Sequence, residues 1–264
     1  MGHKSKVTSE HWIFNYLLAF LFLPLVFMSC AEMPLNFKKS DAYDYPIKPG
    51  TPEWRAFTNH DEMLKACQVP EITLNKMSTT GLVETVLTYP LYEDWLAYNY
   101  PQQGFDAIET QFNGIRELLN RKDAGEKLLE RYKTMDPAAI GKDWSSEKRG
   151  FYSMSFQNIE ILLAQDSILT NLSETQHNDL IKQGLIKIHA KQQVPSVYGW
   201  GSMESSAWVI GKALKQAQFV SFMQIIQTDA DLQHFLDTGS FLNDSDLNLI
   251  LSQAPQYLNE KQMN

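Results

Sequence analysis

Helix-capping and helix-breaking residues recur along the chain from Thr51 onward and divide it into short amphipathic segments. Thr51 is a capping residue placed before a proline, Pro52, which suits the first position of a helix. Ser78 precedes a segment in which apolar residues fall on one helical face: Leu82, Val83, Val86 and Leu87. The spacing therefore predicts a succession of short helices that bury one face each.

Two further segments carry the spacing of a capping box, in which a side chain at the helix start and one three residues later satisfy each other's backbone donors. Ser173 and Gln176 have this spacing, and Asp123 and Glu126 have it with Asp in the leading position. We expect a helix to begin at each of these two pairs.

Strand signals are nearly absent, since no run of β-branched residues alternates over more than a few positions. We therefore predict an all-α fold, built as helical pairs in an armadillo-like stack or as an irregular bundle. Two segments, LIKQGLIKIHAKQQ and WVIGKALKQAQF, each place a glycine (Gly184 and Gly211) on the expected buried face. A polar joint near residues 141–150 predicts two helical subdomains, 51–137 and 138–264.

The amino terminus has the layout of an export signal. Lys4 and Lys6 precede an apolar run from Trp12 to Met28, which Asn15 and Pro24 interrupt. A membrane-spanning helix needs about 20 apolar residues, and a proline weakens it. This segment could be an ordinary cleaved signal, an uncleaved helix or the signal of a lipoprotein.

The run ends at Ser29-Cys30, and here the sequence resembles a bacterial lipoprotein signal, although Phe27 and Met28 depart from the usual residues. The resemblance implies cleavage of residues 1–29 and acylation of Cys30. Acyl chains bind a membrane with about 0.8 kcal/mol per buried methylene, so no spanning segment is needed. We expect residues 30–50 to be a tether to the folded body and the protein to reside in the outer membrane.

The stretch from about residue 52 to 137 contains MSTTGLVETVLTYPLYEDWLAYNYPQQGFDAIETQFNGIRELLNRKDAGEKLLERYKTMDP. It resembles a segment of uncharacterised exported proteins of Gram-negative gut anaerobes. Gly81 departs from that pattern, in which Glu or Ala is common at the same position. The resemblance implies export and a helical fold, and it implies no activity.

Composition excludes one class of partner. The formal net charge is −8 and no stripe of Lys and Arg offsets it, so we expect no nucleic acid to bind. The chain has two cysteines, so no disulfide framework is expected, and with Cys30 acylated Cys67 is predicted to be a buried apolar residue.

No motif predicts a catalytic, metal or cofactor site. The histidines lack the spacing of metal ligands on one helical face, and no glycine-rich phosphate loop follows a strand. Glu84, Glu93 and Asp94 lie among aromatic residues, which is the raw material of a sugar-cleaving cleft. A solvated acidic face beside a buried aromatic stripe explains the same pattern.

The loop VPSVYGWGS between two predicted helices places Tyr198 and Trp200 next to glycines. Such rings can stack on a flat ligand, and they can equally fill a gap between helices. We single out these two residues as the candidate ligand-binding pair.

Three functions fit these features. The first is a lipid-anchored binding or interaction module for a protein, peptide or glycan partner, because stacked helices present concave surfaces. The second is an envelope hydrolase that acts on glycan or peptide through an acidic aromatic cleft. The third is a structural or immunity-type lipoprotein. We expect the first.

Overall fold

The structure is a computed structural model that describes residues 41–240 and 244–263. The predicted signal segment 1–29 and the predicted lipidation site Cys30 lie outside the described residues. The described residues form helices joined by short loops, with no strand among them. The all-α prediction is therefore confirmed.

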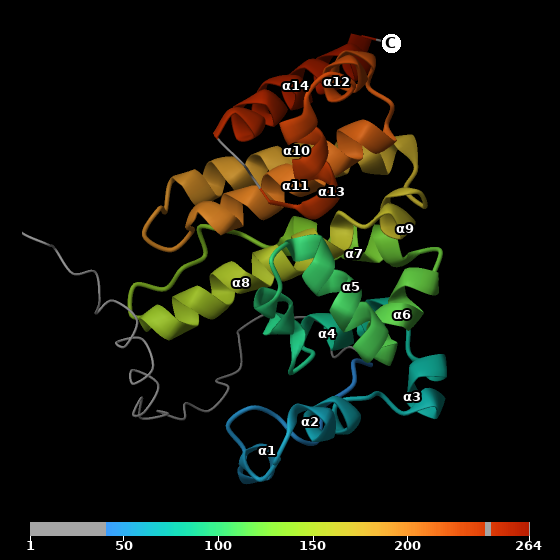
Figure 1. The fold of residues 1–264 in the computed structure, drawn as a ribbon, viewed down its shortest axis with the longest axis vertical. Helices are drawn as coiled ribbons and strands as arrows, with labels where there is room; N and C mark the ends of the chain where they lie inside the picture. Colours follow the sequence, from blue (N-terminus) through green and yellow to red (C-terminus); the bar gives the residue numbers. More distant parts are fainter. Residues whose placement is uncertain (1–40, 241–243, 264) are drawn as a thin grey trace, which may run out of the picture. The chain divides into compact units, whose positions relative to one another are not determined.

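The helices follow one another in chain order, as the labels of Figure 1 show. They are α1 (Pro52–Arg55), α2 (His60–Ala66), α3 (Glu71–Lys76), α4 (Thr79–Leu87), the 3-10 helix η1 (Tyr92–Ala97), α5 (Pro101–Gln111), α6 (Asn113–Asn120), α7 (Ala124–Thr134), α8 (Ser146–Leu163), α9 (Asp166–Leu169), α10 (Glu174–Gln192), α11 (Trp200–Gln216), α12 (Val220–Ile226), α13 (Ala230–Thr238) and α14 (Asp244–Met263).

Helix α11 is the centre of the carboxy-terminal half, where it packs against α8, α10, α13 and α14. Figure 1 shows α10 and α11 side by side. Gly184 of α10 allows this approach, because a Cβ at that position would lie 2.6 Å from a side-chain carbon of Ile210. Gly211 of α11 likewise gives room to Leu236 of α13, 2.7 Å from its missing Cβ. Both glycines therefore lie on buried faces, as the sequence predicts.

One continuous apolar core extends through residues 45–257, and the described residues all belong to one compact unit. The predicted boundary between residues 137 and 138 is crossed by direct contacts. The hydroxyl of Tyr198 donates to the carbonyl of Pro137 at 2.9 Å, and α7 packs against α8 and α10. The two predicted subdomains therefore share a single core.

The end of the predicted tether packs on the body instead of leaving it. Asp41 accepts hydrogen bonds from the backbone N–H and the hydroxyl of Ser78, at 2.7 and 2.6 Å. These bonds hold the pKa of Asp41 below its usual range. Tyr45 is buried, and its hydroxyl donates to the carbonyl of Thr85. This contact explains the glycine at residue 81, because a Cβ on Gly81 would lie 2.0 Å from an oxygen of Asp41.

Local capping signals are confirmed at three helix starts. Thr51 accepts from the N–H of Trp54, and Ser78 accepts from the N–H of Gly81. The capping box of Ser173 is complete, with both reciprocal bonds present. Each bond satisfies a donor that the helix leaves without a partner.

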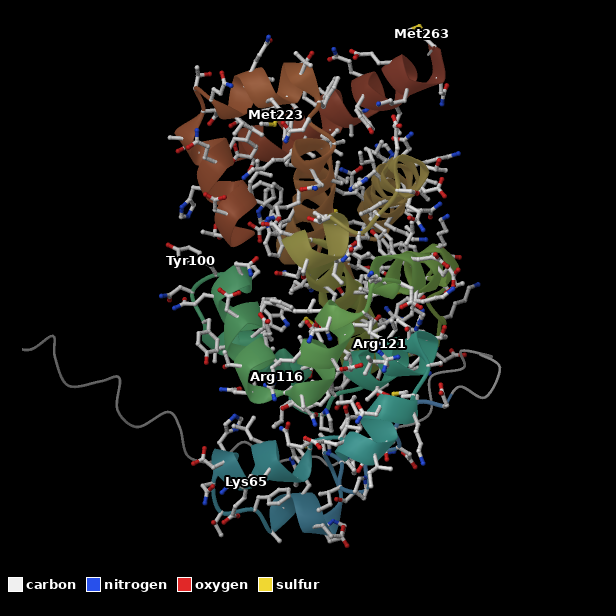
Figure 2. The ribbon with its side chains drawn as sticks, turned by 90° about the vertical axis from the view of Figure 1, so that its right-hand side faces the viewer. Lys65, Tyr100, Arg116, Arg121, Met223 and Met263 are labelled. Atoms are coloured by element: carbon white, nitrogen blue, oxygen red, sulfur yellow. The ribbon has the colours of Figure 1, made fainter. Side chains whose placement is uncertain are left out.

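The predicted capping box at residue 123 is wrong. Asp123 makes no capping bond to α7 and instead accepts a hydrogen bond from Thr79 of α4 at 2.8 Å. Two residues earlier, the guanidinium of Arg121 donates to the carbonyls of Leu74 and Met77, at 3.1 and 2.7 Å. Figure 2 shows Arg121 where α6 approaches α3 and α4. The loop between α6 and α7 thus fastens neighbouring helices, which explains why Asp123 serves a tertiary contact.

Candidate functional site

The structure places the two predicted ligand-binding residues in different surroundings. Tyr198 is 2% exposed, donates to the carbonyl of Pro137 and packs edge-to-face on Phe156 at 5.8 Å between ring centroids. Trp200 is 45% exposed at the first position of α11. Of this pair, the accessible ring is that of Trp200, and its role in binding stays a prediction.

The three carboxylates singled out in the sequence each have a different partner. Glu84 accepts from the guanidinium of Arg131 at 2.7 Å. The pKa of Glu93 is raised by burial, which a hydrogen bond from Asn158 partly offsets. Burial also raises the pKa of Asp94, whose oxygen lies 3.2 Å from His60 Nε2. The three carboxylates therefore have different contacts.

Cys67 is fully buried and has no disulfide partner among the described residues. Burial, with a smaller effect of nearby Asp94, raises the pKa of its thiol to about 11. The thiol therefore stays protonated at neutral pH and packs as an apolar group, as predicted.

A hollow of about 200 Å³ lies between η1, α8, α11 and the residues that follow α13. Aromatic and aliphatic residues form part of its lining, and polar side chains form the rest. The lining consists of Trp95, Leu96, Tyr98, Asn99, Pro101, Gln157, Ile161, Gly201, Glu204, Ser205, Trp208, Gly239 and Ser240. None of Glu84, Glu93, Asp94, Tyr198 and Trp200 belongs to it, although Gly201 directly follows Trp200.

Asn158 of α8 fixes the wall that η1 provides. Its side-chain oxygen accepts from Trp95 Nε1 at 3.2 Å, and its carbonyl accepts from the Tyr92 hydroxyl at 2.9 Å. At the start of α5, Tyr100 packs edge-to-face on His234 of α13, with 5.3 Å between ring centroids. Figure 2 shows Tyr100 at the end of α5 nearest α13. The wall that η1 provides is therefore held by two hydrogen bonds to Asn158.

Gly201 opens the hollow between two polar side chains. A Cβ at this residue would meet only Gln157 Oε1 at 3.6 Å and Glu204 Oε2 at 3.9 Å within ordinary contact distance. These two oxygens, from α8 and α11, therefore face the same small volume beside Gly201. A hydroxyl or N–H in that volume would find two acceptors on neighbouring helices.

Behind the hollow lies a fully buried polar cluster centred on Glu160 of α8. Its carboxylate accepts from Lys191 Nζ at 2.9 Å for each oxygen. It also accepts from the hydroxyls of Tyr132, Ser205 and Ser206, at 2.7, 2.5 and 2.7 Å. Glu160 and Lys191 are both 0% exposed. Ser205 belongs to both the cluster and the lining of the hollow, so the cluster fixes one side chain of the hollow.

The geometry of this cluster is that of a closed ion pair. Burial lowers the pKa of Lys191, and the facing carboxylate of Glu160 opposes that effect. Burial and the same carboxylate raise the pKa of Tyr132 well above its usual range, so this hydroxyl remains a donor. Lys191 also donates to the carbonyl of Ser202 at 2.9 Å, which leaves the ammonium well coordinated. A buried pair with these additional bonds is the arrangement that offsets desolvation.

Sequence reasoning did not predict this cluster. One signal was present, because Glu160 is the single charged residue in the apolar run NIEILLA. A charge on the buried face of a helix requires a partner. The partner, Lys191 of α10, is 31 residues away and is identified only by the tertiary structure.

A second, wider depression lies between α12 and α13. It is lined by Ser221, Gln224, Ile225, Thr228, Asp229, Ala230 and Asp231. Its described lining contains no aromatic ring, and it is more open to solvent than the hollow beside Gly201, which is therefore the better candidate site.

Within the described part of the chain, no His, Cys, Asp and Glu side chains gather in a group that could hold a metal ion. Likewise, none of the described helices combines the length and the apolar content that a membrane crossing needs. Comparison with protein-family models, curated proteins and solved structures gives no match to this chain.

Proposed function

We propose that this chain is an exported protein of the bacterial envelope that is anchored in the outer membrane through acylated Cys30 and binds a ligand in the hollow beside Gly201. The observation that carries the binding function is that hollow, with aromatic and polar side chains from separate elements converging on about 200 Å³. Such concave sites with a few convergent polar groups are typical of ligand binding.

Binding is favoured over glycoside hydrolysis by the charges at the site. Hydrolysis of this kind uses two carboxyl groups on opposite sides of the scissile bond. Among the described residues that line the hollow, Glu204 carries the one carboxylate. The next carboxylate, Glu160, contacts Ser205 but is held by Lys191 in a closed ion pair. A carboxylate engaged in this way is a poor acid or base.

The anchor is tested at Cys30. In the native cell, the wild-type protein is expected to incorporate a labelled fatty acid and to sediment with membranes. Cys30→Ser removes the thiol that carries the acyl chains, so we expect it to lose the label and to leave the membrane fraction. Cys67→Ser is the matched control, since Cys67 is buried in the folded body. Membrane attachment of the Cys30→Ser protein would contradict the proposal.

The binding function is tested at Tyr98, an exposed ring that lines the hollow. We expect the wild-type protein, purified in detergent from its native membrane, to retain a ligand from an envelope extract. Tyr98→Ala is expected to retain at least about tenfold less, equivalent to 1.4 kcal/mol, with an unchanged melting temperature. The control is Tyr198→Phe, which alters a buried hydroxyl only. Equal retention by Tyr98→Ala and wild type would contradict ligand binding in the hollow.

A further inference from the structure

The size of the hollow limits its ligand to a small ring. Pockets for drug-sized molecules measure about 300–1,000 Å³, whereas this hollow measures about 200 Å³. A folded partner or a peptide helix does not fit into such a volume. A single six-membered ring with its substituents does.

The polar lining has the hydrogen-bonding character that a neutral polyol needs. Asn99 and Gln157 carry amides and Ser240 carries a hydroxyl, so each of these groups has a donor and an acceptor. Ser205 donates its hydroxyl hydrogen to Glu160, so it presents its oxygen as an acceptor. Sugar hydroxyls likewise donate and accept. A cation would leave the donors of the lining without partners, and an anion would face the carboxylate of Glu204.

The orientation of the polar groups supports the same ligand. Gln157 Oε1 and Glu204 Oε2 face one volume from two helices, 3.6 and 3.9 Å from the position of a Cβ on Gly201. Two adjacent acceptors suit two neighbouring hydroxyls on one ring. Ser205 is held in place from behind by its 2.5 Å bond to Glu160, so its oxygen is a fixed partner.

The apolar side of the hollow provides a surface for the C–H face of the ring. Tyr98 and Leu96 are 37% and 55% exposed and belong to the lining, beside the more buried Trp95. The indole of Trp95 is fixed by its bond to Asn158. Aromatic rings present an apolar face and bury large areas, which suits the flat side of a pyranose.

We propose that the hollow binds one neutral sugar ring, either a free monosaccharide or the terminal residue of a glycan. This inference rests on the proposed binding function and names the ligand class of the same site. The polar edge of the ring lies between Gln157, Glu204 and Ser205, and its C–H face lies toward Tyr98.

Gly201 provides the test, because a side chain there enters the hollow without a clash at its Cβ. Gly201→Phe fills the space between Gln157 and Glu204. Gly201→Ala is the matched control, since it replaces the same glycine and adds only one methyl group, and alanine favours a helix at least as much as phenylalanine does. Gln157→Ala is a second variant that removes a proposed ligand contact and adds no bulk.

The probes are D-glucose, D-galactose, D-mannose and N-acetyl-D-glucosamine, with D-glucuronate and D-glucosamine as the charged counterparts, and oligosaccharides ending in the four neutral sugars. Binding to the full chain in detergent is measured by saturation-transfer NMR and titration. We expect wild type and Gly201→Ala to bind at least one neutral sugar equally, and Gly201→Phe and Gln157→Ala to bind it at least about tenfold more weakly.

Each outcome decides the proposal. Binding of oligosaccharides but not of free sugars supports it and identifies a glycan end as the source. Preference for glucuronate or glucosamine over every neutral sugar overturns it, and so does undiminished binding by both Gly201→Phe and Gln157→Ala. If no sugar binds while wild type still retains a Tyr98-dependent ligand, the sugar assignment fails and the binding function stands. If neither occurs, both fail.

Discussion

Lys191→Met is expected to lower the free energy of unfolding by about 3–5 kcal/mol, because it leaves the buried carboxylate of Glu160 without its cation. Methionine fills a volume similar to that of lysine and adapts to irregular space. The loss of stability therefore reflects the unpaired charge of Glu160 more than a change in packing. For a chain of this size, the melting temperature should fall by roughly 6–20 °C. Chemical denaturation at neutral pH measures the change.

Two controls separate the unpaired charge from other effects of the substitution. Lys187→Met, one turn earlier in α10, removes a buried ammonium that donates to the carbonyl of Met135 and leaves no carboxylate unpaired. We expect it to cost less, about 1–3 kcal/mol. Glu160→Met combined with Lys191→Met should recover much of the loss, because apolar replacement of a buried pair is often tolerated.

Recovery in the double variant is expected to be partial for a reason that the structure gives. Ser205 and Ser206 retain an acceptor, the carbonyl of Ser202, at 3.2 and 3.4 Å. The hydroxyl of Tyr132 bonds to Glu160 and would lose that acceptor. A Lys191→Met protein as stable as wild type would show that the ion pair is not a determinant of the fold.

How far the sequence predicts this fold depends on the distance over which each signal acts. Ser78 and Ser173 cap their helices through bonds to residues three positions away, so the sequence alone predicts these caps. Asp123 shows the same local pattern, yet its side chain bonds to Thr79 of another helix. Tertiary contacts compete with local caps, and a single sequence does not show which prevails.

The candidate site was less accessible to prediction for the same reason. The loop around Tyr198 and Trp200 lies next to the hollow, and the pattern of rings and glycines identified that neighbourhood. Which ring is exposed depends on the packing of Tyr198 against Phe156 and Pro137. The hollow itself combines η1, α8, α11 and the end of α13, which lie far apart in the chain. The spacing of residues along one helix does not show which other elements that helix contacts in the folded chain.

Gly104→Ala is expected to lower the stability of the protein and also to change the shape of the hollow. A Cβ at Gly104 of α5 would lie 2.4 Å from the carbonyl oxygen of Trp95 and 2.8 Å from its Cα. These are backbone atoms of η1, so no side chain can rotate away and η1 must move. Overpacking of this kind costs about 1–3 kcal/mol and sometimes more.

Gly150→Ala gives the matched control, because a Cβ at Gly150 within α8 meets no atom within 4 Å. The same chemical change should there stabilise the protein by about 0.5–1 kcal/mol, since alanine favours a helix interior. Opposite shifts of the unfolding midpoint in denaturant would verify both expectations.

Because Trp95 and Tyr98 line the hollow next to the displaced segment, Gly104→Ala should also weaken ligand binding, whereas Gly150→Ala should not. Unchanged stability of Gly104→Ala would mean that η1 and α5 do not pack as closely as the structure has them.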